Sequence, residues 1–227
     1  MDNQNKRRPD AEGEKSYWKP GNMLYPLPVV MVSCGREGEK PNIITVAWAG
    51  TVCSDPAMVS ISVRKERFSH QIIKDTGEFV INLVNKPLVR ATDYCGVKSG
   101  REVDKFQEMR LTPLPSQHVK AVGIGESPVN LECRVVDVKE LGSHDMFIAQ
   151  VVGVTVDNRY MNDKGKFNLN ASGLVTYSHG EYFELGKRLG SFGYSVKRPV
   201  KKRGSKGGAG KSGVSAGEGK KSRRTNG

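Results

Sequence analysis

A two-residue alternation of bulky and small side chains recurs along the chain, and it restricts the possible fold more than any other feature. In residues 43–49, Ile44, Val46 and Trp48 alternate with smaller residues, as in a strand that buries one face. Comparable segments occupy residues 28–34, 58–64, 78–84, 129–141, 146–158 and 173–185. Helices are expected near residues 69–76, 85–94 and 99–109. Many strands joined by short turns predict a mostly β fold, a closed or partly closed antiparallel barrel with a few short helices.

The net charge of +12 is concentrated at the C-terminal end. Residues 197–227 hold 11 Lys and Arg against one Glu, which leaves a net charge of +2 for residues 1–196. The segment 199–227 is rich in Gly, Ser and Lys, so we expect it to be disordered and able to contact anionic polymers without specificity. With a flexible segment at 1–19, this composition predicts one folded domain at 20–198.

Several classes of protein are disfavoured by the sequence. No apolar run reaches the roughly 18 residues of a membrane span, and the first residues lack the apolar segment of a signal peptide. The four cysteines and four histidines are scattered, so we expect free thiols, no metal site and a cytoplasmic location. Cys95 is expected to be a buried structural thiol because no partner for its activation is evident.

The small residues of three predicted strands form a second face. Thr45 and Ala47, Ser60 and Ser62, and Asn82 alternate with bulky neighbours, where an ordinary solvent-exposed face would carry Lys, Glu and Gln. Such a face can be a floor on which a flat molecule lies against backbone amides, or a second packed layer or a subunit interface. The same alternation predicts that the side chain of Trp48 points into the core.

Positive charge follows the strand at 58–64. Arg64, Lys65 and Arg67 precede a predicted helix with Ser69 as its N-cap, and a helix N-terminus favours anions. The group therefore suits the phosphate of a planar ring compound, although a solvated basic turn with Glu66 as its counter-ion is the alternative.

Two further segments are candidate parts of a site. Lys98 and Ser99 lie between two glycines before a predicted helix, which suits a phosphate-binding loop or, equally, a turn between helices. Tyr177, His179 and Tyr182 either cover a ligand or are ordinary strand residues.

The ordered set of "LYPLPVVMVSC", "PNIITVAWAG", "DPAMVSISVRKERFSH", "EFVINL", "CGVKSGREVDKF" and "GSFGYSVKR" resembles the flavin reductase-like family, the flavoredoxin-type FMN-binding split barrels. The resemblance implies a homodimer of Greek-key split barrels with FMN near the subunit interface. It also implies a cofactor site made by Asn42, Thr45, Ala47, Trp48, Ser62, Arg64, Ser69, His70, Asn82, Lys98, Ser99 and Lys105, with Trp48 taking part through its backbone. It assigns no catalytic residue.

Three functions remain open at this point. The first is an oxidoreductase that moves electrons from NADH or NADPH through bound FMN to free flavin or a redox-protein acceptor. The second is a flavoredoxin-like electron carrier without NAD(P)H turnover of its own. The third, from a different class, is a nucleic-acid-binding β-barrel with a basic tail.

Overall fold

The structure, a computed structural model, describes residues 15–196. The predicted basic tail at 199–227 lies outside the described residues, as does most of the predicted N-terminal segment at 1–19. The chain divides into two compact units, the first ending at Gly186 and the second beginning at Lys187. Within the second unit the described residues contain one 3₁₀ helix, η4 (Tyr194–Val196). No helix in the described part of the chain is long and apolar enough to cross a membrane.

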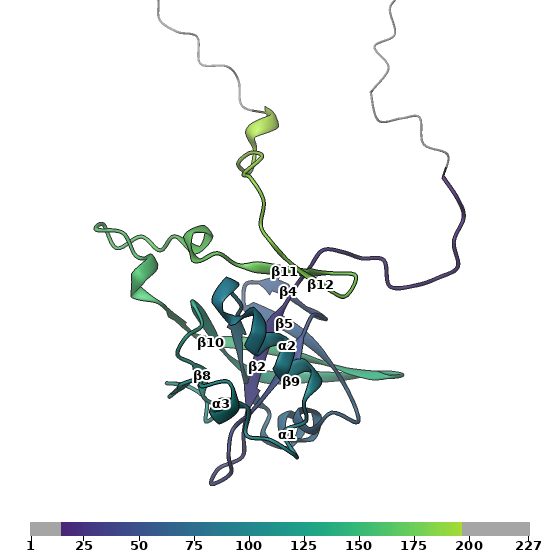
Figure 1. Ribbon diagram of the computed structural model, residues 1–227, viewed down its shortest axis with the longest axis vertical. Coiled ribbons are helices and arrows are strands. Elements are labelled where there is room, and N and C mark those ends of the chain that lie inside the picture. The colour runs from purple at the N-terminus through teal and green to yellow at the C-terminus, as the bar shows by residue number, and fades with distance from the viewer. Residues whose placement is uncertain (1–14, 197–227) are drawn as a thin grey trace, which may run out of the picture. The chain divides into compact units, whose positions relative to one another are not determined.

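The first unit is mostly β. Its strands are β1 (Leu27–Pro28), β2 (Val30–Cys34), β3 (Asn42–Val46), β4 (Ala49–Ser54), β5 (Ala57–Arg64), β6 (Glu78–Leu83), β7 (Pro113–Leu114), β8 (Gly123–Ile124), β9 (Val129–Leu141), β10 (His144–Val156), β11 (Val175–Ser178) and β12 (Glu181–Glu184). Its helices are α1 (Phe68–Thr76), α2 (Val89–Val97) and α3 (Lys105–Glu108), with the 3₁₀ helices η1 (Lys86–Leu88), η2 (Asn158–Tyr160) and η3 (Leu169–Ser172). Figure 1 shows α1, α2 and α3 beside the strands and the β9–β10 hairpin reaching out beyond them.

The main sheet has seven antiparallel strands in the order β3-β2-β6-β9-β10-β5-β4. Its two edge strands, β3 and β4, are consecutive in the chain and are separated only by Ala47 and Trp48. Because so short a link cannot span a flat sheet of this width, the sheet has to curl until its edges approach each other. The backbone N–H of Ser62 on β5 donates to the carbonyl oxygen of Trp48 at 2.8 Å, which extends the β4–β5 pairing into this corner. The fold is the predicted split β-barrel, open between β3 and β5.

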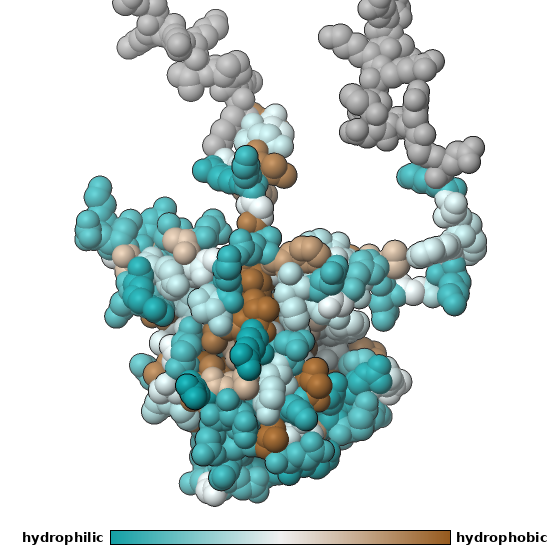
Figure 2. All heavy atoms as spheres, in the orientation of Figure 1, coloured by the Kyte–Doolittle hydropathy of each residue, from teal (hydrophilic) through white to brown (hydrophobic). Residues whose placement is uncertain are grey.

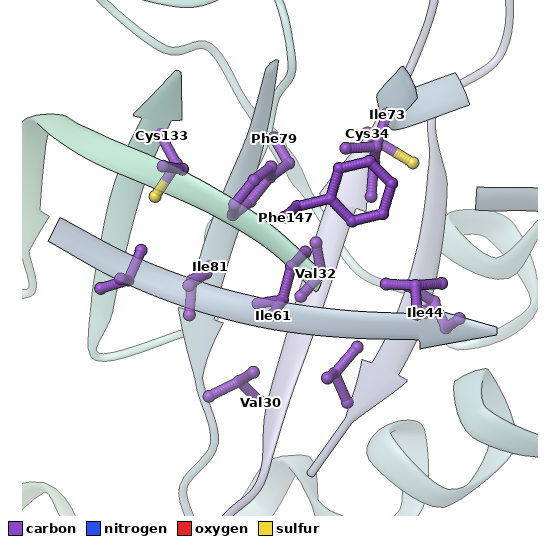
Figure 3. Close-up of a cluster of buried hydrophobic side chains, with 14 of the residues drawn as sticks. Val30, Val32, Cys34, Ile44, Ile61, Ile73, Phe79, Ile81, Cys133 and Phe147 are labelled. Atoms are coloured by element: carbon purple, nitrogen blue, oxygen red, sulfur yellow. The ribbon is translucent and has the colours of Figure 1, made fainter. Parts of the chain in front are cut away.

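The bulky face of the predicted strands is the interior of the barrel. Ile44, Ile61 and Phe79 are buried in one cluster with Phe147 of β10 and Ile73 of α1. Figure 3 shows these side chains pointing toward one another from different strands, with Phe79 and Phe147 near the centre. The alternation in the sequence therefore identifies the core residues of these strands correctly.

Trp48 departs from this pattern, and the prediction that its side chain enters the core is wrong. The side chain is 40% exposed. Strand β3 ends at Val46, so the backbone has already turned toward β4 when it reaches Trp48. The two-residue alternation holds only while the backbone stays extended. At the turn between β3 and β4 the backbone is no longer extended, so the side chain of Trp48 lies at the surface.

Helix α1 differs from prediction at its start. It begins at Phe68 with Arg67 as N-cap, and no side chain caps it, so the predicted cap by Ser69 is wrong. Ser69 lies inside the first turn because the turn that leaves β5 closes at Arg67, whose N–H donates to the carbonyl of Arg64. The predicted end is confirmed: Gly77 adopts φ 66° and donates its N–H to Ile73.

Helix α3 is also shorter than predicted. It covers only Lys105–Glu108, and its N-cap is Asp104, whose side chain accepts from the N–H of Gln107. The predicted start of this helix at Ser99 is wrong. Oγ of Ser99 accepts from the N–H of Arg101 at 3.2 Å, and this bond closes a turn that precedes the helix.

Candidate functional site

A cavity of about 490 Å³ lies at the split of the barrel. Its floor consists of Thr45 and Ala47 at the end of β3 and Ser62 on β5. These small side chains leave room because the bulky residues that alternate with them point into the core. For β3 and β5, the small-residue face is therefore a cavity floor.

On β6 the small-residue face is a packed layer and not a cavity floor. Val80, Asn82 and Val84 are completely or almost completely buried, so this part of the face is a packed layer. Asn82 donates to the carbonyl of Met31 at 2.9 Å and accepts from the N–H of Ile124 at 2.9 Å. The segment 119–124 packs on this face of β6, so the face is covered and does not open as a cavity.

The floor is tied to helix α2. Oγ1 of Thr45 donates to the carbonyl oxygen of Thr92 at 2.5 Å. A Cβ on Gly96 of α2 would lie only 3.2 Å from Cβ of Thr45, so the helix approaches the strand closely at this point. These contacts hold the end of β3 in place beneath the cavity.

A second cavity, of about 400 Å³, adjoins the first, and Ile44 and Arg67 line both. It opens at the first turn of α1, where Phe68 and Ser69 contribute to its wall. Because Phe68 and Ser69 line this space and α1 has no side-chain cap, the positive end of the helix dipole lies at the cavity.

The wall opposite α1 comes from the glycine-flanked loop, with Lys98, Ser99 and Gly100. Asn42 joins the two walls, since its side-chain amide donates to Oγ of Ser69 at 2.8 Å. A Cβ at Gly100 would lie 2.1 Å from Oδ1 of Asn42, so this position has room only for glycine. The loop and the helix start, which are far apart in the sequence, therefore meet around one space.

Arg64 and Arg67 supply the positive charge of the site. Arg64 is an exposed residue that lines the first cavity and lies 3.5 Å from the carboxylate of Glu66. Arg67 stands where the two cavities join. The prediction of a basic rim therefore agrees with the geometry for the two arginines, whose charge Glu66 balances only in part. It is wrong for Lys65, which lines neither cavity and pairs with Glu140 and Asp145.

His144 is a residue that the sequence reasoning missed. It lies opposite Arg64 in the β5–β10 register and lines the first cavity, where its ring is stacked on Trp48 with centroids 6.3 Å apart. Burial and the nearby charge of Arg64 lower the pKa of His144 below its ordinary value of 6.5. Only the pairing between strands reveals this residue, because nothing in its local sequence marks it.

The aromatic segment near the end of the first unit also reaches the site. Tyr177 and Tyr182 line the first cavity, and Tyr182 donates a hydrogen bond to the carboxylate of Asp93 at 3.2 Å. His179 is not among the lining residues and instead packs against Tyr25, with ring centroids 4.5 Å apart. Two of the three candidates therefore cover the cavity.

Three predicted site residues have their polar groups engaged inside the protein. Nε2 of His70 lies 2.8 Å from Oδ2 of Asp145. Asn82 holds the strands together, as described above. Lys105 lines the second cavity, yet its ammonium donates to the carbonyls of Ile43 and Cys95 at 2.6 and 2.8 Å.

Nearby, burial raises the pKa of the Cys95 thiol to about 11, which agrees with a structural role.

The comparisons with known proteins agree with this geometry. A curled sheet with a cavity at its split is typical of the split-barrel class of proteins. The family model of the flavin reductase like domain matches residues 22–186 of this chain. The chain belongs to the flavin reductase-like family.

Individual relatives are similar over most of the chain. An uncharacterized protein of Archaeoglobus fulgidus is 32% identical over 160 residues, 70% of this chain and 88% of the relative. The flavoredoxin of Desulfovibrio vulgaris (Miyazaki F) superposes with a TM-score of 0.75 at 32% identity, covering 81% of this chain and all of that one. A flavoredoxin from Methanosarcina acetivorans gives a TM-score of 0.73 at 26% identity, with 82% and 100% covered.

Proposed function

We propose that this protein binds FMN and uses it to carry electrons from NADH or NADPH to free flavin or to a redox protein. One observation carries the proposal: a cavity with a flat floor of small residues joins, at Arg67, a second cavity at the uncapped start of a helix. A planar ring system linked to a phosphate has the matching shape and charge.

The first cavity suits the ring system. Thr45, Ala47 and Ser62 are small enough for a flat molecule to approach the backbone of β3 and β5. Trp48 and His144 form one wall, while Tyr177 and Tyr182 provide aromatic surface for a second planar molecule. These residues orient the reactants and keep water from the space between them.

The second cavity suits the phosphate. The first N–H groups of α1 are hydrogen-bond donors, and Arg67 adds a charged donor where the cavities meet. The hydrogen bond between Asn42 and Ser69 fixes the start of α1 relative to β3. The N–H donors of the helix start are therefore in position before a ligand binds.

Bound FMN would supply the redox chemistry, because a flavin accepts hydride from a reduced nicotinamide and passes electrons on singly or in pairs. The chain itself contributes binding, orientation and a positive rim. No side chain is required as a general acid, so the proposal assigns none.

Similarity to two flavoredoxins supports a second candidate, an electron carrier that keeps FMN bound and has no NAD(P)H turnover of its own. Anaerobic addition of NADH or NADPH to the purified protein separates the candidates. Loss of the visible flavin band within the time of turnover supports the oxidoreductase. A band that persists until a reduced redox protein is added supports the carrier.

The same preparation tests the cofactor. We expect a yellow protein that releases FMN, and not FAD, on denaturation. A colourless protein that stays colourless after incubation with FMN and removal of the excess would contradict the proposal.

We also propose a homodimer. Trp48, Val52 and Val154 are all exposed, and Figure 2 shows hydrophobic residues gathered in a strip on the face drawn there, bordered by hydrophilic ones. Light scattering during size exclusion should give twice the mass of the chain, whereas a monomer at all concentrations would contradict this proposal.

Contact of the basic segment with anionic polymers remains a prediction. A variant that lacks residues 199–227 should lose any RNA or DNA binding and keep its flavin absorbance. Nucleic-acid binding that survives the deletion would instead support the nucleic-acid-binding barrel.

A further inference from the structure

A separate cavity of about 680 Å³ lies away from the proposed flavin site. It is bordered by η1 and α2, by the end of α3 and by η2, and no residue lines both this cavity and either cavity of the flavin site. Its volume falls in the usual range of small-molecule sites. Three features of its lining indicate what it would bind.

The first feature is a buried amide without a partner. Asn85 lines the cavity and is 4% exposed, and its side-chain oxygen is buried without a hydrogen-bond partner. An unpaired buried polar group is costly, and most such groups in folded proteins are satisfied. A ligand with an N–H donor would satisfy this oxygen, and the amide N–H₂ of the same side chain would be available to a ligand acceptor.

The second feature is positive charge without ion pairs. Arg90 and Arg110 line the cavity, and neither forms an ion pair within residues 15–196. Arg110 adopts φ 52°, a left-handed conformation in which a residue with a side chain is strained. Glycine is the usual residue at such a position after a helix, so the arginine is kept there at some cost in stability.

The lining holds three further charged groups. Arg159 is held by the carboxylate of Asp157. The carboxylate of Glu126 accepts from the N–H and the hydroxyl of Thr112. Glu108 is the remaining acidic residue in the lining. Arg90 and Arg110 are therefore the cations of the lining that pair with no carboxylate in the described residues, and Glu108 and Glu126 equal them in formal charge.

The third feature is an apolar wall. Leu88, Ala91 and Leu111 line the cavity and belong to the buried cluster beneath α2, and the ring of Tyr160 lies at its border. A flat ring can pack on this surface.

We propose that this cavity binds a purine nucleotide. An asparagine side chain matches the hydrogen-bonding edge of adenine, to which it donates one bond and from which it accepts another. The arginines suit a phosphate, with which guanidinium groups form paired charged hydrogen bonds. The apolar wall and Tyr160 accommodate the base.

The test is calorimetric titration of the full-length protein with adenosine monophosphate, in the presence of excess FMN to occupy the flavin site. Saturable binding at one site per chain is expected. Asn85→Ala and Arg110→Gly should each weaken it roughly 10- to 100-fold. Lys74→Ala, which removes one exposed positive charge from α1, should leave it unchanged.

Thermal unfolding keeps the variants interpretable. Arg110→Gly should not lower the unfolding temperature, because glycine relieves the left-handed backbone strain. Asn85→Ala should lower it little, because the buried oxygen has no partner to lose. Weaker binding without loss of stability therefore reports a ligand contact and not a damaged fold.

Truncated ligands and one further variant complete the test. Adenosine, which lacks the phosphate, should bind more weakly than adenosine monophosphate because it cannot contact the arginines. Ribose 5-phosphate, which lacks the base, should bind more weakly because it cannot contact Asn85. No saturable binding of adenosine monophosphate would overturn the proposal. So would binding that Arg67→Ala weakens and Arg110→Gly does not, because that pattern places the nucleotide at the start of α1.

Discussion

The side-chain amide of Asn42 donates a hydrogen bond to Oγ of Ser69 at 2.8 Å, and this bond joins the beginning of β3 to the first turn of α1. Both residues are buried. The bond sets the position of the helix start, whose uncapped N-terminus is the anion-binding element of the proposed site. Anything that displaces Asn42 should therefore disturb the phosphate end of the site.

Gly100→Ala tests this relationship. The new Cβ would lie 2.1 Å from Oδ1 and 2.6 Å from Cγ of Asn42, so the side chain or the loop has to move. We expect unfolding to become easier by about 1–3 kcal/mol, the usual cost of overpacking, and FMN binding to weaken roughly tenfold. Gly186→Ala is the control, because its Cβ would meet nothing within 4 Å. Equal FMN affinity in both variants would show that Asn42 does not position the phosphate end.

Arg64→Ala tests the basic rim. Arg64 lines the first cavity, so loss of its charged hydrogen bond to the bound flavin should weaken FMN binding roughly 10- to 100-fold, measured by the quenching of flavin fluorescence. Lys164→Ala removes one positive charge from an exposed turn and should leave the affinity unchanged. If both substitutions have the same small effect, Arg64 acts only through the overall charge of the protein.

The pKa of His144 reports the electrostatics of the first cavity. Burial lowers this pKa from 6.5, and the positive charge of Arg64 lowers it further, so the imidazole should be neutral at neutral pH. Arg64→Ala should raise the NMR titration midpoint of His144 toward 6.5, because one of the two causes is removed. A midpoint that does not move would mean that Arg64 and His144 do not share the cavity.

Asp145 should contribute to the acid sensitivity of the fold. Burial alone would raise its pKa, but the hydrogen bond with His70 and the ion pair with Lys65 outweigh burial and hold this pKa below 3.8. A carboxyl group whose pKa is lower in the folded state than in the unfolded state stabilises the protein at pH values above its unfolded-state pKa. This contribution is complete above about pH 5 and is lost as the pH falls through 3.8 toward the folded value.

Asp145→Asn should lower the unfolding temperature at neutral pH, since His70 and Lys65 lose the carboxylate, and should flatten the decline on acidification. Thermal unfolding between about pH 3 and about pH 7 measures both effects. Asp163→Asn, at an exposed turn, is the control and should keep the slope of the parent protein. An unchanged slope in Asp145→Asn would contradict the assignment.

Much of the fold follows from local pattern. The alternation around Ile44, Ile61 and Phe79 gives both the strands and the face that forms the core, because an extended backbone sends successive side chains to opposite sides. The prediction for Trp48 fails where this condition ends, at the corner between β3 and β4. The end of α1 at Thr76 was predicted correctly because the glycine that follows it is a local signal for a helix end.

The candidate site depends more on distant pairing. Arg64 and Ser62 could be selected from their own strand, but the placement of His144 depends on the register between β5 and β10. The partner of Ser69 likewise comes from β3, a strand that the sequence alone does not bring to the helix start.

By itself, the sequence determined the alternating strands, their core face, the existence of a small-residue face and the position of the basic segment, because each depends on neighbours a few residues apart. Only the tertiary structure decided that the sheet curls through a two-residue corner and that β3 and β5 meet at the split. It also decided which part of the small-residue face remains open as a cavity. The physical reason is that strand pairing and helix packing join residues far apart in the chain, and no local period encodes which surfaces they cover.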